Sequence, residues 1–181
     1  IMAAVLACTA LAGCTAQKDA DTAKENITTT KKVTDDSNFK LSYTQADSLD
    51  PFKSKTQNNQ VLSSLVFESL FDIDENWESV PNIATKYEFS DGKTLKVSFN
   101  QSLTFSDGSP IESDDIIYSF NAAKKSPAYK NSLKYIGSAS AGADNTIVFY
   151  LKKANPNAVN LLTFPIASTN DDENGYPIGS G

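Results

Sequence analysis

Residues 86–99 read Lys-Tyr-Glu-Phe-Ser-Asp-Gly-Lys-Thr-Leu-Lys-Val-Ser-Phe, and this stretch decides the fold class. Apolar and polar side chains alternate on both sides of Asp91-Gly92, which is the pattern of two half-buried strands. An Asp-Gly pair favours a two-residue hairpin turn, because glycine tolerates a positive φ. The stretch therefore predicts an antiparallel hairpin with its turn at Asp91-Gly92 and one face in a core.

Further strands flank this hairpin. Residues 135–140 and 146–151 predict a second pair of strands that a short turn joins. Residues 39–43 alternate with a period of two and predict a strand, and residues 165–167 resemble a brief one. Antiparallel pairs therefore supply most of the predicted sheet.

Helical patterns lie between these strands. Residues 58–71 carry apolar side chains at helical spacing, and Asn58 or Asn59 is suited to cap that helix. Another helix is expected to begin with Ser113 as its cap, and residues 156–164 predict a short third one. Together these elements predict a mixed α/β chain of the α+β class.

The composition excludes several classes of activity. The 181 residues carry 16 basic and 22 acidic side chains, all the basic ones are lysines, and there is no histidine. A Ser-His-Asp triad, a Cys-His pair and a histidine-based zinc site are therefore impossible. The net charge of −6 argues against a general nucleic-acid binder, which would carry a basic excess.

The amino-terminal segment predicts a lipid anchor. Residues 1–12 form an uncharged apolar run, the right size for part of a signal peptide and too short to span a bilayer. Leu11-Ala12-Gly13-Cys14 looks like a bacterial lipobox, in which the thiol of Cys14 would receive the lipid. The polar stretch that follows cannot bury a core. We therefore expect three segments, namely a partial signal peptide at 1–13, the lipidated cysteine with a disordered tether at 14–37, and a folded part at 38–181.

Two acidic motifs fail as sites. Asp72-x-Asp74-x-Asn76 begins like a calcium loop, but the sixth position, which must be glycine, is Trp77. Asp114-Asp115 fails as a catalytic pair, because adjacent helical side chains diverge and these two suit the helix start better. No metal site, cofactor or catalytic residue is predicted.

A series of short motifs resembles the extracellular solute-binding proteins of family 5, which are oligopeptide and dipeptide receptors of ABC importers. No single motif is specific, and their order carries the resemblance. In chain order the motifs are Asp50-Pro51, Phe67-Glu68-Ser69-Leu70-Phe71, Pro81-Asn82-Ile83-Ala84, residues 87–94, residues 103–110, residues 113–120 and Pro177-Ile178-Gly179-Ser180-Gly181.

The resemblance implies a fold and a role. The fold would be periplasmic-binding-protein-like, type II. The chain would hold the amino-terminal lobe with an inserted subdomain at 50–165, and the second lobe would lie beyond residue 181. The protein would be a monomer without enzymatic activity that captures short peptides outside the cell and delivers them to a membrane permease with cytoplasmic ATPases. It would sit lipid-anchored on the outer face of the cell membrane, or in the periplasm of a Gram-negative cell.

One group of residues is expected to line the ligand. Thr44, Gln45 and Ala46 would leave the first strand, where a receptor of this kind pairs strand edges with the peptide backbone. These residues could equally do no more than end a strand.

Other functions stay open at this stage. The same scaffold could bind nickel, haem or a sugar oligomer, or serve as a receptor for a peptide pheromone. A cell-wall enzyme or an adhesive surface lipoprotein would share the anchor and tether. An enzyme would need converging carboxylates, and an adhesin would be expected to show repeats.

Overall fold

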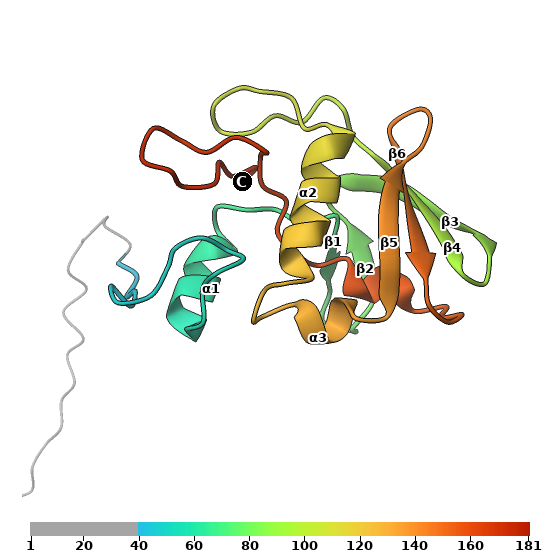
Figure 1. The fold of residues 1–181 in the computed structure, drawn as a ribbon, viewed down its shortest axis with the longest axis horizontal. Coiled ribbons are helices and arrows are strands. Elements are labelled where there is room, and N and C mark those ends of the chain that lie inside the picture. Colours follow the sequence, from blue (N-terminus) through green and yellow to red (C-terminus); the bar gives the residue numbers. More distant parts are fainter. Residues whose placement is uncertain (1–39) are drawn as a thin grey trace, which may run out of the picture. The chain divides into compact units, whose positions relative to one another are not determined.

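The computed structural model describes residues 40–181. The predicted signal segment, Cys14 and the tether lie outside the described residues. Within residues 40–181 the structure has three α-helices, six strands and one short 3-10 helix (Figure 1).

A four-stranded antiparallel sheet forms the centre of this unit, with the strand order β3-β4-β6-β5. Its register pairs Phe89 with Leu95 and Val97 with Ile147. Both predicted strand pairs are thereby confirmed. The four strands are β3 (Ala84–Asp91), β4 (Thr94–Phe99), β5 (Ile136–Ala141) and β6 (Thr146–Leu151).

The first hairpin turns one residue later than predicted. Asp91 pairs with Thr94, so the two turn residues are Gly92 and Lys93. The Asp91 carboxylate accepts the N–H groups of Lys93 and Thr94, both at 2.7 Å. The side chain of the aspartate therefore holds the turn. Gly92 does not have a positive φ, and among the described residues the glycines that do are Gly108 and Gly175.

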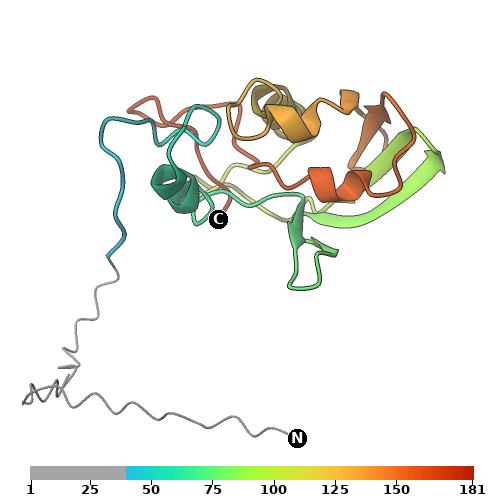
Figure 2. The same cartoon turned by 90° about the horizontal axis from the view of Figure 1, so that it is seen from below.

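Helix α2 (Ser113–Ala123) covers one face of the sheet (Figures 1 and 2). Its Phe120 meets Phe149 of β6 edge-on, with ring centroids 5.5 Å apart, and both rings are fully buried. The predicted cap is wrong by one residue. Glu112 is the N-cap, and Asp115 reaches back to accept its N–H at 2.9 Å. This reciprocal capping box satisfies donors at the helix start more fully than one serine would. The short helix α3 (Lys130–Leu133) follows.

A small second sheet and a 3-10 turn complete the fold. Strands β1 (Phe71–Ile73) and β2 (Ser79–Pro81) form a two-stranded antiparallel ribbon. The predicted helix at 156–164 is shorter than expected, a 3-10 helix η1 (Ala158–Leu161). The Phe71 N–H donates to the carbonyl of Leu162 at 3.3 Å, which ties the ribbon to η1.

The predicted helix at 58–71 is wrong in its second half. Helix α1 (Gln57–Ser63) stops after seven residues, and its N-cap is Thr56 instead of Asn58 or Asn59. Beyond the turn that follows, the Glu68 carbonyl accepts the N–H of Ile166 at 2.8 Å, and Ser69 forms a bridge with Pro165. This pairing also accounts for the brief strand expected at 165–167. Cross-chain pairing and burial of the neighbouring apolar residues outweigh the local helical pattern.

The predicted strand at 39–43 is not observed at its described residues, 40–43. These residues have exposed side chains, and no described strand pairs with them. An alternating pattern alone does not make a strand, because the backbone groups of a strand need a partner. The chain turns at Thr44 and packs on α1 instead.

The segment at 166–181 packs back onto earlier parts of the chain. Ser180 Oγ accepts the N–H of Glu68 at 3.1 Å and donates to the carbonyl of Ile166 at 3.2 Å. The Gly181 N–H donates to the Val66 carbonyl at 2.9 Å, and the Gly179 carbonyl accepts the N–H of Ser106 at 2.9 Å. The segment thus joins two turns that are far apart in sequence. The division at 50–165 stays a prediction.

Candidate ligand-contacting site

Thr44, Gln45 and Ala46 lie in a tight turn just before α1. The Asp47 N–H donates to the Thr44 carbonyl at 3.0 Å and closes the turn. Gln45 and Ala46 are exposed, and Thr44 is half-buried. The structure therefore keeps the three predicted contact residues together, on a turn instead of a strand exit.

Asn59 fastens this turn to α1. Its side chain is buried, and its Oδ1 accepts the N–H of Thr44 at 2.7 Å. Its Nδ2 donates to the carbonyls of Thr44 at 3.1 Å and Ser48 at 3.0 Å, with a longer contact of 3.3 Å to that of Asp47. One amide thus satisfies both ends of the turn, since asparagine carries both donors and acceptors.

Asp47 fastens the other side of the turn. Its Oδ2 accepts the hydroxyl of Thr56 at 2.8 Å and the N–H groups of Lys55 at 2.9 Å and Thr56 at 2.8 Å, and a longer bond comes from the hydroxyl of Ser54. These bonds, the Thr56 hydroxyl first among them, hold the pKa of the Asp47 carboxyl well below its ordinary value. The ionised carboxylate therefore acts as a fixed acceptor that joins the turn to the residue preceding α1.

Asp50 and Pro51 complete the loop. The buried Asp50 accepts the Phe52 N–H on Oδ1 at 2.8 Å, and its Oδ2 lies 2.7 Å from Nζ of Lys53. The Asp50 carbonyl accepts the N–H of Ser54 at 2.9 Å. The bonds of Asp50 thus fix the backbone of the loop between the turn and α1.

Gln45 is the exposed polar side chain of this turn. The amide of Gln45 can both donate and accept a hydrogen bond, as a peptide group does. Asn59 and Asp47 hold the turn that carries Gln45. The turn is therefore preorganised, and little conformational entropy would be lost when a ligand binds to it. That Thr44, Gln45 and Ala46 contact a ligand stays a prediction, and the sequence analysis did not identify the roles of Asn59 and Asp47 in holding their turn. A polar residue on the inner face of α1 was the only signal for Asn59.

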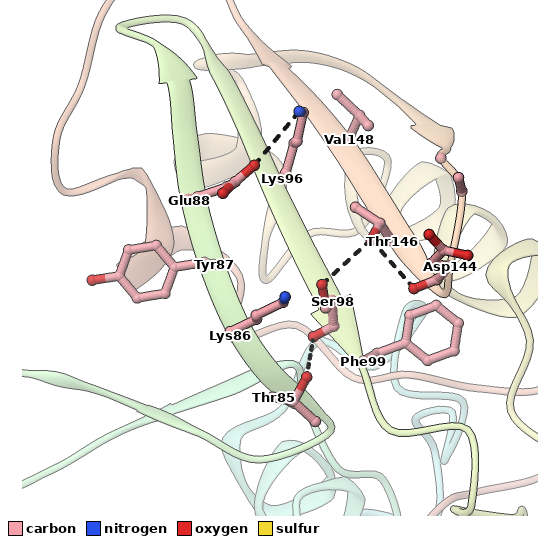
Figure 3. A pocket seen from close by; sticks show the side chains of 12 residues that line it. Thr85, Lys86, Tyr87, Glu88, Lys96, Ser98, Phe99, Asp144, Thr146 and Val148 are labelled. Atoms are coloured by element: carbon pink, nitrogen blue, oxygen red, sulfur yellow. Dashed lines mark hydrogen bonds and ion pairs between the residues drawn. The ribbon is translucent and has the colours of Figure 1, made fainter.

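A hollow lies on the open face of the main sheet, away from this turn (Figure 3). Its volume is about 480 Å³, and both polar and apolar side chains line it. The side chains there pair with one another: Lys96 lies 3.5 Å from Glu88, and Ser98 and Thr146 share a hydrogen bond of 3.3 Å. This pattern is typical of a solvated sheet face, and none of the three predicted contact residues lines the hollow.

The rejected calcium loop is a self-capped turn. Asp74 accepts the N–H groups of Asn76 at 2.9 Å and Glu78 at 2.8 Å, and these bonds, that of Glu78 foremost, lower the pKa of its carboxyl. Trp77 has a φ of 65° and an exposed side chain. Among residues 40–181 there is no group of three or more histidine, cysteine or acidic side chains that could hold a metal ion. Across the same residues, no helix is both long and apolar enough to cross a membrane.

Solved structures share this fold. MppA, a periplasmic murein tripeptide binding protein in its unliganded open form, matches with 25% identity and a TM-score of 0.64, over 74% of this chain and 32% of that chain. A second matching structure is of the Escherichia coli murein tripeptide binding protein MppA. AppA, an oligopeptide-binding protein from Bacillus subtilis in complex with a nonapeptide, matches with 20% identity and a TM-score of 0.57, over 66% of this chain and 25% of that chain. NikA from Staphylococcus aureus, in complex with Ni(L-His)2, matches with 22% identity and a TM-score of 0.53, over 63% and 25%.

These matches confirm the mixed α/β fold of the periplasmic-binding-protein-like kind. The chain spans about a quarter to a third of the length of these structures. Residues 78–181 match the bacterial extracellular solute-binding proteins, family 5 Middle. This match covers more than half of the chain and includes the sheet, α2 and the returning segment at 166–181. The chain therefore belongs to family 5 of the bacterial extracellular solute-binding proteins.

Proposed function

We propose that this chain is part of the substrate-binding lipoprotein of an ABC importer, which captures oligopeptides or dipeptides outside the cell and delivers them unaltered to a membrane permease. Membership of family 5 supports a solute-binding role. The likeness to MppA and AppA supports peptides as the ligand class. The observation that carries the site is the turn at Thr44–Ala46, which Asn59 and Asp47 hold in place.

The proposed recognition is simple in chemical terms. An extended peptide offers alternating N–H and C=O groups, and Gln45 with the backbone of its turn would bind some of them. Recognition through backbone groups gives affinity without strong dependence on the ligand's side chains. The second lobe, which we place beyond residue 181, would supply the opposing wall, and closure of the two lobes would enclose the ligand.

Calorimetry on the complete gene product tests the peptide role. Mixed short peptides are expected to release heat on binding, and Gln45→Ala should weaken binding by about threefold to tenfold, because one hydrogen-bonding group is lost. Gln57→Ala is the matched control, since Gln57 is an exposed residue at the start of α1. The 181-residue chain alone should bind peptide weakly. Absence of peptide heat with the complete protein, or tight binding by the 181-residue chain, would contradict the proposal.

A nickel chelate is the second candidate ligand, because NikA was solved with Ni(L-His)2. The same titration distinguishes the two. Heat from the nickel–histidine complex and none from peptides would favour the nickel chelate over peptides as the ligand.

The lipid anchor is proposed separately on Cys14. Mass spectrometry of the protein isolated from its own membranes should find the mature chain beginning at Cys14 with a diacylglyceryl group on the sulfur. The Cys14→Ser variant should carry no diacylglyceryl group in the same measurement. An unmodified thiol on the mature native chain would contradict this proposal and leave the peptide role intact.

A further inference from the structure

Charge is unevenly distributed along this acidic chain. Residues 116–170 hold six lysines and a single acidic residue, Asp144, although the chain as a whole has a net charge of −6. All the other acidic residues lie before or after this stretch. The lysines are Lys124, Lys125, Lys130, Lys134, Lys152 and Lys153.

Folding brings these lysines to one end of the sheet. The end of α2, helix α3, the start of β5 and the end of β6 lie together on the lower side of Figure 1, the side from which Figure 2 is seen. Nζ of Lys124 donates to the Gly137 carbonyl at 2.6 Å, and the Lys152 N–H donates to the Tyr135 carbonyl at 3.0 Å. Asp144 belongs to the turn between β5 and β6. Figure 1 shows this turn at the opposite end of the strands.

The loop before α1 extends this cluster. A hollow of about 410 Å³ lies between that loop and the end of α2, and its lining contains Lys53, Lys55 and Lys125 but no acidic residue among the described ones. Lys53 is paired with Asp50, while Lys55 and Lys125 have exposed side chains. Lys124 is half-buried, and its Nζ is held by the Gly137 carbonyl. We call the surface that the exposed lysines form the basic face, made of Lys55, Lys125, Lys130, Lys134, Lys152 and Lys153.

The end of a helix alone does not account for the basic face. The carbonyl end of α2 attracts cations, which would explain one or two lysines near it. The remaining lysines come from α3, from the loop after β6 and from the loop before α1, so four separate segments contribute positive charge. Tyr135 lies among them, about half exposed, with Nζ of Lys134 5.0 Å from its ring centroid. An amphipathic ring beside lysines suits the boundary between water and lipid headgroups.

We propose that the basic face docks the domain on anionic lipid headgroups of the membrane. The proposal rests on the proposed function in that it places the protein at the outer face of the cell membrane. Each lysine close to an anionic bilayer raises the partition coefficient by about fivefold, and the attraction falls off within a Debye length. The acidic remainder of the chain is repelled by the same surface, so the domain binds with one orientation.

Vesicle binding tests this proposal on residues 15–181, which lack both the apolar signal segment and the proposed lipidation site at Cys14. The chain should sediment with vesicles of phosphatidylglycerol and phosphatidylcholine, stay in solution with phosphatidylcholine alone, and be released by high sodium chloride. Reversal of two lysines of the basic face, Lys130→Glu with Lys134→Glu, should lower the partition coefficient by about 25-fold or more. Thermal unfolding of this double variant and of the control described next checks that both are folded.

The matched control is Lys86→Glu with Lys96→Glu, on the open sheet face that Figure 3 shows. Both double variants have the same net charge. If the basic face is what binds, the control variant should keep a partition coefficient within about twofold of that of the starting chain. Equal losses in the two variants would overturn the proposal, as would failure of the starting chain to bind anionic vesicles. In the latter case, retention on immobilised polyglutamate would assign the basic face to an acidic macromolecule. Peptide calorimetry is independent of every one of these outcomes.

Discussion

Replacing Asn59 with alanine is expected to lower the free energy of unfolding by about 3 kcal/mol. The Asn59 side chain is fully buried and holds the backbone of the Thr44–Ser48 turn from both sides. Alanine would leave an N–H and carbonyl groups of that turn without a partner, and each such group costs about 1–3 kcal/mol when it stays away from water. Chemical denaturation measured by circular dichroism gives the difference.

The variant should also release the turn at Thr44–Ala46. Limited proteolysis is expected to cut between Thr44 and Thr56 in Asn59→Ala at protease concentrations that leave the parent chain intact. Asn58→Ala is the control, because Asn58 is the exposed neighbour in the same helical turn and its loss should change stability by no more than about 0.5 kcal/mol. Equal stability of the two variants would show that the amide does not hold the turn.

Replacing Gly179 with alanine should cost about as much, by a different mechanism. A Cβ atom at this position would clash with the Val66 carbonyl oxygen and would lie 2.7 Å from Val66 Cγ1. The closer contact is with backbone, so no rotamer change can relieve it, and overpacking of this kind costs about 1–3 kcal/mol or more. We expect a loss of roughly 3 kcal/mol in the free energy of unfolding, again measured by denaturation.

Two further variants separate the causes of that loss. Gly92→Ala places its Cβ 3.2 Å from the Cβ of Ala154, a side-chain atom, and should be tolerated within about 1 kcal/mol. Val66→Ala in the Gly179→Ala background removes the contact with Cγ1 but keeps the one with the carbonyl. It should therefore restore little stability, and full restoration would place the clash in the side chain instead of the backbone.

Elements that depend on local pattern could be predicted from the sequence. The hairpin at 86–99 and the strand pair at 135–151 alternate cleanly, because one face of the sheet lies under α2 and the other faces water. The start of α2 was found to within one residue. Its true cap, Glu112, was missed because the reciprocal partner Asp115 was read as a favourable charge at the helix start.

Elements that depend on distant partners could not be predicted in this way. The stretch at 58–71 has a helical pattern, yet its second half pairs with residues 165–166, which only the folded chain brings close. The stretch at 39–43 has a strand pattern, yet its described residues have no strand beside them. The candidate site also depends on distant partners. The bonds of Asn59 to Thr44 span fifteen residues, so no local sequence pattern predicts them.

The contacts of Ser180 and Gly181 set an order for biogenesis. Ser180 Oγ accepts the N–H of Glu68, which lies 112 positions earlier in the chain. During synthesis, more than half of the domain is made between the turn near Val66 and its partners Ser180 and Gly181. Contacts of such long sequence separation slow folding. The turn near Val66 therefore gains these bonds only after residues 180 and 181 have been synthesised.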